Sequence, residues 1–138
     1  MIAYIDASVL LRLVLDQKGR LREWQEIDLG VASTLVEVEC LRTVDRLRLG
    51  DALSDGKIAA LRAAIYGLVE ELDCVEIDRS VLARASQPLS TGLGTLDAIH
   101  LATALLWREA SGEAIVMATH DKALGRAARA HGMAVVGA

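Results

Sequence analysis

Apolar residues recur along the chain in two patterns, one typical of buried strands and one typical of helices. Short runs that are apolar almost throughout predict strands at residues 1–5, 31–32, 74–77, 114–118 and 134–136. Strands of this kind, which do not alternate with polar positions, are typical of a parallel sheet that is covered on both faces.

Longer segments between these runs carry apolar residues at helical spacing. Helices are predicted at residues 8–15, 20–29, 35–49, 55–72, 81–85, 95–110 and 122–131. Ser33 or Thr34, Ser54 and Thr95 are candidate N-caps, whereas Gly50 and Gly132 are candidate stops. The clearest amphipathic stripe comprises Ile58, Leu61, Ile65, Leu68 and Leu72.

Strands that alternate with helices predict an α/β fold with a mostly parallel central sheet. The chain has 138 residues, of which 53% are hydrophobic and 25% charged, so it can enclose a core without disulfides or metals. We therefore expect one domain spanning residues 1–138. The opening apolar segment is too short for a signal peptide, and no apolar run reaches the roughly 20 residues of a membrane helix. We therefore expect a cytoplasmic protein with no membrane association. The two cysteines form no CxxC pair, which agrees with this location and predicts buried thiols.

Four acidic residues lie where an open parallel sheet usually forms its site, beyond the carboxyl ends of the strands. Asp6 and Asp121 follow predicted strands, Asp97 lies in the first turn of a predicted helix, and Glu39 lies in the middle of another. Each aspartate could simply cap a helix. Glu39 cannot cap its helix, but it shares a face with Arg42 and Arg46, so a solvated row of ion pairs is an equal alternative.

Four segments together resemble the acidic motifs of the PIN-domain family, and in length and detail its VapC toxins. They are Tyr4-Ile5-Asp6-Ala7-Ser8, Ser33 through Glu39 to Arg42, Thr95-Leu96-Asp97-Ala98-Ile99-His100, and Ala118-Thr119-His120-Asp121. The resemblance covers nearly the whole chain, and the segment around Asp97 is its most specific part. It implies a PIN-like α/β/α sandwich with a central, mostly parallel sheet of four to five strands.

The resemblance also implies a metal-dependent endoribonuclease that cleaves RNA and is the toxin of a type II toxin–antitoxin pair. Its partners would be a small VapB-like antitoxin and a second copy of the chain in a homodimer. The implied catalytic residues are Asp6, Glu39, Asp97 and Asp121, the three aspartates hold Mg²⁺ or Mn²⁺, and Ser8 and Thr119 are accessory hydroxyls. Clustered carboxylates repel one another, and this independently favours a hard cation with oxygen ligands.

Substrate recognition leaves few traces in the sequence. A net charge of −4 argues against broad, non-specific coating of nucleic acid, and the lack of Phe leaves no obvious stacking platform. Arg12, Arg42 and Arg46 are candidate phosphate contacts, although they could merely balance nearby acids. His100 lies one turn after Asp97 and could touch substrate or simply pack in the core.

Two other functions remain possible from the sequence. A receiver-like regulatory domain also combines a parallel sheet with Mg²⁺, but Asp6 lacks the acidic neighbour that this class requires. A PIN-fold nuclease of RNA processing, outside toxin–antitoxin systems, would carry the same four acids.

Overall fold

The protein folds around a five-stranded sheet in which every pair of neighbouring strands is parallel. The computed structural model describes residues 1–16, 18–50 and 53–138. The strands are β1 (Ile2–Ile5), β2 (Leu29–Ser33), β3 (Asp73–Val75), β4 (Val116–Ala118) and β5 (Val135–Val136), in the order β3-β2-β1-β4-β5. The predicted α/β class and parallel sheet are thus confirmed, with β1 at the centre.

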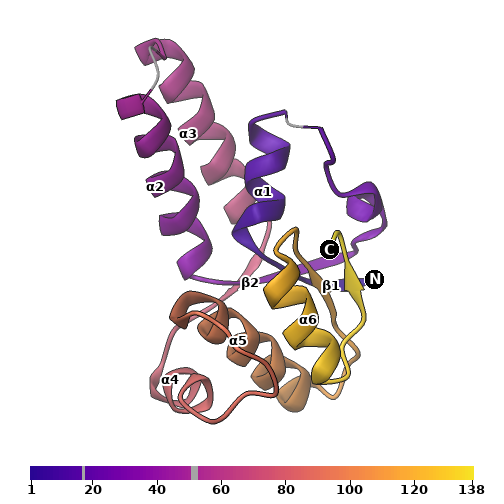
Figure 1. Cartoon of the computed structure of the whole chain (residues 1–138). Coiled ribbons are helices and arrows are strands. Elements are labelled where there is room, and N and C mark those ends of the chain that lie inside the picture. The colour runs from indigo at the N-terminus through magenta and orange to yellow at the C-terminus, as the bar shows by residue number, and fades with distance from the viewer. Residues whose placement is uncertain (17, 51–52) are drawn as a thin grey trace.

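Helices cover both faces of the sheet and make an α/β/α sandwich (Figure 1). One face carries α1 (Ala7–Val14), α2 (Leu35–Gly50) and α3 (Asp55–Glu70), of which α2 and α3 form a projecting hairpin. The other carries α5 (Thr95–Ser111) and α6 (Lys122–Ala130), with α4 (Arg79–Ala85) packed against α5. No helix in the described part of the chain has the length and apolarity needed to cross a bilayer.

Side chains of β1 alternate between two apolar cores, one on each face of the sheet. Ala3 and Ile5 join the core beneath α1, α2 and α3, whereas Tyr4 joins the core beneath α5 and α6. The predicted stripe on α3 faces the first core, where Ile65 is fully buried. Both cysteines are free, and Cys40 is buried while Cys74 is half-buried.

The prediction of a helix over residues 20–29 is wrong. Only a short 3₁₀ helix, η1 (Arg22–Glu26), forms there, and β2 begins at Leu29 beside Ile2 of β1. Pairing with the central strand therefore overrides the local helical pattern. At Gly30 a Cβ would lie 2.5 Å from a methyl carbon of Leu72, so this strand position accommodates close packing by α3 and the segment after it.

The structure separates the three predicted N-caps. The Ser33 hydroxyl accepts a hydrogen bond from the Leu35 amide (3.1 Å), and the Ser54 hydroxyl accepts one from the Lys57 amide (3.1 Å). Thr95, by contrast, is the first residue of α5 and follows Gly94 at the N-cap, where no side chain caps the helix. The cap at Ser54 is therefore confirmed and the cap at Thr95 is wrong, while Ser33 lies two residues before the first residue of α2 and accepts from its first amide.

The contrast between Ser54 and Thr95 gives a stability prediction. Ser54→Ala removes an acceptor for an otherwise unpaired helix amide, so it should lower the free energy of unfolding by about 1 kcal/mol. Thr95→Ala removes no cap and should change it by less than about 0.5 kcal/mol. Urea unfolding of both variants measures the difference, and equal losses would contradict the assignment of the caps.

Candidate active site

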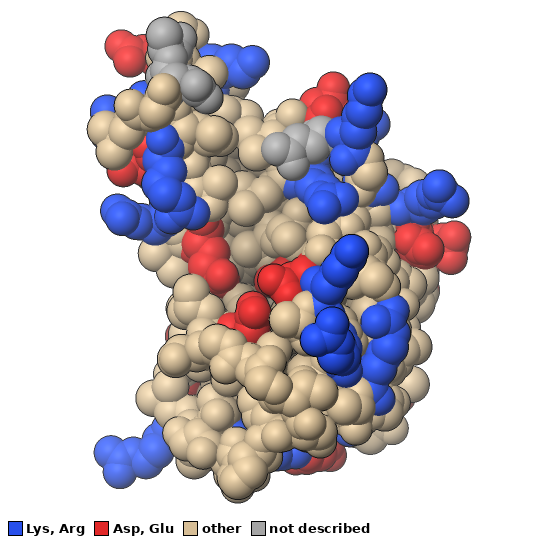
Figure 2. Space-filling model, in the orientation of Figure 1, with Lys and Arg blue, Asp and Glu red and all other residues tan. Residues whose placement is uncertain are grey.

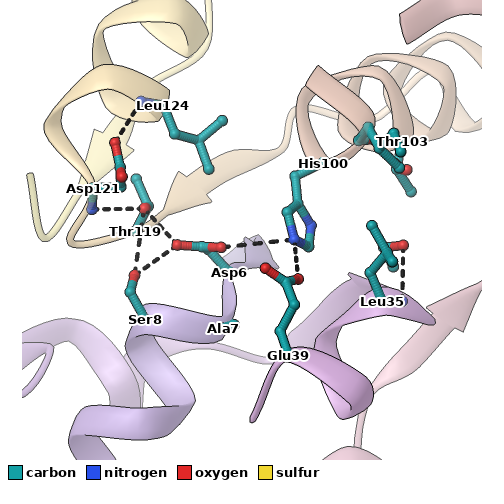
Figure 3. Close-up of polar contacts among 12 residues, drawn as sticks. Asp6, Ala7, Ser8, Leu35, Glu39, His100, Thr103, Thr119, Asp121 and Leu124 are labelled. Atoms are coloured by element: carbon teal, nitrogen blue, oxygen red, sulfur yellow. Dashed lines mark hydrogen bonds and ion pairs between the residues drawn. The ribbon is translucent and has the colours of Figure 1, made fainter. Parts of the chain in front are cut away.

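The carboxyl ends of the two central strands are joined by hydrogen bonds to Asp6. This residue follows β1 and is 5% exposed, and its Oδ2 accepts hydrogen bonds from the hydroxyls of Ser8 (2.6 Å) and Thr119 (2.8 Å). Thr119 follows β4 and is fully buried. Two positions 113 residues apart in sequence are thereby fixed beside each other (Figure 3).

The same two hydroxyls also accept hydrogen bonds from the backbone of the β4–α6 connection. Ser8 Oγ accepts from the His120 amide and Thr119 Oγ1 accepts from the Asp121 amide, each over 2.9 Å. Each hydroxyl thus donates to Asp6 while holding this connection in place. The accessory positions predicted at Ser8 and Thr119 therefore adjoin Asp6.

A cleft of about 480 Å³ opens beside Asp6. All four predicted acids line it, and they come from four separate segments: Asp6, Glu39, Asp97 and Asp121. Figure 2 shows acidic side chains gathered in a central hollow with basic side chains around it. Parallel strands and their following helices bring these groups to one edge of the sheet, as the sequence predicts.

Glu39 extends from the second turn of α2 to a buried histidine on α5. Its Oε1 lies 2.5 Å from His100 Nε2, and the same nitrogen lies 3.9 Å from Asp6 Oδ1. Among the described residues Glu39 forms no ion pair with Arg42 or Arg46, so the alternative of a solvated ion-pair row is wrong. The fully buried His100 is a part of the site that sequence analysis left open. The only signal for it is its position one turn after Asp97.

Comparison with known proteins agrees with this geometry. The family profile described as PIN domain matches residues 3–130. The chain belongs to the PIN-domain family. The protein chain of a solved structure titled "Toxin-antitoxin complex from Klebsiella pneumoniae" has the same fold, with a TM-score of 0.64, 17% sequence identity and 88% of each chain covered. No curated protein matches the chain.

Family membership makes the receiver-like alternative wrong. Within this PIN domain, the structure shows which of the aspartates cap a helix. Asp121 is the N-cap of α6, and its Oδ1 accepts hydrogen bonds from the amides of Ala123 (2.7 Å) and Leu124 (3.0 Å). Asp6 occupies the N-cap position of α1 but its side chain makes no capping bond, and its Oδ2 accepts from the two hydroxyls instead. Capping therefore explains Asp121 in part and leaves Asp6 and Asp97 without that explanation.

Burial and neighbouring carboxylates both act on Asp97. Partial burial, followed by repulsion from Asp121 and Asp6, raises the pKa of Asp97 to about 6, although His100 opposes the shift. Carboxylates held together in this way favour a bound cation, because a cation removes the repulsion.

The donor set suits Mg²⁺ or Mn²⁺, because the aspartates at positions 6, 97 and 121 offer only oxygen atoms. Within residues 1–16, 18–50 and 53–138, no three His, Cys, Asp or Glu side chains form a close group of metal ligands. The carboxylates would have to draw together around an ion. Metal ligation by Asp6, Asp97 and Asp121 stays a prediction.

The three predicted phosphate contacts separate into two places. Arg42 and Arg46 line the acidic cleft. Arg12 does not: it lines a neighbouring depression of about 380 Å³, and its guanidinium donates to the Gly19 carbonyl (3.1 Å). Arg12 therefore lies outside the cleft that Glu39 lines, because this bond holds its side chain toward the loop after α1.

The raised pKa of Asp97 predicts how stability depends on pH when divalent metal is removed. Since the folded pKa of about 6 exceeds the ordinary value of 3.8, the folded state binds more protons, and stability should fall as pH rises from about 4 to 6. Asp97→Asn should flatten this fall and unfold at a higher temperature than wild type at pH 7. Thermal unfolding in EDTA between pH 4 and 8 tests it, and a variant that is less stable at pH 7 would contradict it.

Proposed function

We propose that this PIN domain is a metal-dependent endoribonuclease and the toxin of a type II toxin–antitoxin pair. The observation that carries the proposal is the convergence of Asp6, Glu39, Asp97 and Asp121 on one cleft. Family membership supports nuclease chemistry. The toxin–antitoxin title of the structural neighbour supports the biological role, although at 17% identity the likeness itself establishes only the fold.

In this proposal the aspartates at positions 6, 97 and 121 hold the ion. Bound Mg²⁺ or Mn²⁺ supplies Lewis-acid polarisation of the scissile phosphate and lowers the pKa of water. Ser8 and Thr119 keep Asp6 in one orientation through its Oδ2. Glu39 is the carboxylate on the α2 side of the cleft, where it can accept a proton from attacking water.

The rim of the cleft suits a protein inhibitor as well as RNA. Apolar side chains of Val38 and Leu96 lie beside the acids, and they are 49% and 50% exposed. An antitoxin segment that places an apolar side chain on this rim and an Arg among the acids would complement both features. We propose that a small VapB-like antitoxin binds here. The homodimer also stays a prediction, as does the cytoplasmic location.

Cleavage of RNA by the purified chain is the direct test. Wild type should cleave in Mg²⁺ or Mn²⁺ and stop in EDTA, and Asp6→Asn and Asp97→Asn should each lower the rate by roughly 100-fold or more, because each removes a charged metal ligand. The measurement is single-turnover cleavage of labelled RNA.

Glu37→Gln is the matched control, because Glu37 lies on the same helix as Glu39 but outside the cleft. It should cleave like wild type. Cleavage that persists in EDTA, or that survives both Asn substitutions, would contradict the mechanism. Co-expression with the product of a neighbouring small gene, and loss of cleavage in the complex, would separate a toxin from a PIN nuclease of RNA processing.

The arginine positions predict a difference in the salt dependence of RNA binding. In the Asp97→Asn background, Arg42→Ala and Arg46→Ala should each reduce the slope of log K against log salt by about 0.7, the value for one phosphate of a single strand. Arg12→Ala should do so only with RNA long enough to extend beyond the cleft. The exposed Arg79 on α4 provides a control, and unchanged slopes for Arg42→Ala and Arg46→Ala would rule out phosphate contact.

A further inference from the structure

A buried chain of hydrogen bonds runs from the sheet to Glu39. It begins at the backbone amide of Ser33 in β2, which donates to the Tyr4 hydroxyl oxygen (3.2 Å). That oxygen lies 2.7 Å from His100 Nδ1, and His100 Nε2 lies 2.5 Å from Glu39 Oε1. Tyr4 and His100 are both fully buried, whereas Glu39 at the end of the chain is partly exposed where it lines the cleft.

The direction of the last bond follows from the chemistry of its partners. An ionised carboxylate can only accept, so His100 Nε2 must carry the proton that it shares with Glu39. The other ring nitrogen is held by Tyr4, and the two rings meet edge to face with centroids 5.8 Å apart. The imidazole is therefore fixed at both ends, with its Nε2 directed at Glu39.

Electrostatics favours the same arrangement. Burial by itself lowers the pKa of His100, but the hydrogen bond to Glu39 and the charges of Glu39, Asp6 and Asp97 outweigh it and raise the pKa overall. Because Nε2 lies between Glu39 and Asp6, its positive edge reduces the repulsion between those carboxylates. Figure 3 shows His100 reaching toward both acids from α5.

We propose that Tyr4 and His100 are positioning residues that hold the Glu39 carboxylate by Oε1 and leave its other oxygen for the reaction. This inference rests on the proposed ribonuclease function. A histidine that merely fills the core would need an acceptor, but not an acid lining the cleft. Here the chain of hydrogen bonds ends on the one acid of α2 that lines the cleft, Glu39.

Steady-state kinetics of RNA cleavage tests the proposal. Glu39→Gln and His100→Ala should each lower kcat by roughly 100-fold, and Tyr4→Phe, which removes one hydroxyl, by about 10-fold, with KM little changed. His100→Gln retains an N–H donor and should recover part of the loss. In the Glu39→Gln background His100→Ala should have no further effect, because it acts through Glu39.

Leu105→Ala controls for damage to the fold, because Leu105 lies on α5 in the same core as Tyr4 but does not line the cleft. It should lower the melting temperature and leave kcat unchanged at temperatures where it remains folded. Wild-type cleavage with unchanged kcat in Tyr4→Phe and His100→Ala would overturn the positioning role alone. Absence of cleavage by wild type would overturn the proposed function as well.

A second measurement reads the bonded chain without RNA. In ¹⁵N-histidine-labelled protein without metal, one imidazole should be protonated at Nε2 near neutral pH. Its nitrogen signals should move in both Glu39→Gln and Tyr4→Phe but not in Leu105→Ala. Histidine nitrogen signals that do not shift in Glu39→Gln would overturn the proposed chain of hydrogen bonds, whether or not the protein cleaves RNA.

Discussion

The hydrogen bond from Thr119 to Asp6 fixes the ends of β4 and β1 relative to each other, and the candidate site depends on that alignment. Because every strand is parallel and β1 lies in the middle, the connections after β1, β2 and β4 leave the sheet at one edge. Helices α1, α2 and α6 follow these connections, so Asp6, Glu39 and Asp121 meet there. The topology of the sheet, more than any local motif, gathers the acids.

Gathering carboxylates has an electrostatic cost that the protein offsets differently at each acid. Asp6 is stabilised by two hydroxyls, Asp121 by amides at the start of α6, and Glu39 by His100. At Asp97, partial burial and then repulsion from Asp121 and Asp6 raise the pKa to about 6. Carboxylates whose repulsion is only partly offset lower the stability of the folded state, and such groups are common at functional sites.

Local sequence predicts the fold well where the hydrophobic period is unambiguous, as in the stripe on α3 and the runs that become β1 and β4. It fails at residues 20–29, where pairing with β1 decides the structure. The four acids could be predicted from order and spacing, but the partner of Glu39 could not, because His100 lies 61 residues away and only the folded chain brings them together. The position of the Arg12 side chain could not be predicted either, because its guanidinium donates to the Gly19 carbonyl in a loop.

The four carboxylates therefore differ in how firmly hydrogen bonds hold them, and this difference determines which of them would move to bind a metal ion. The carboxylates of Asp6, Glu39 and Asp121 are each anchored by at least one hydrogen bond. In the part of the chain that the structure describes, Asp97 accepts none from another side chain. Since the acids do not form a close ligand group among these residues, some must move to share an ion. Asp97 is the least anchored of the four carboxylates, and burial and repulsion raise its pKa. Its rearrangement would therefore couple metal binding to stability.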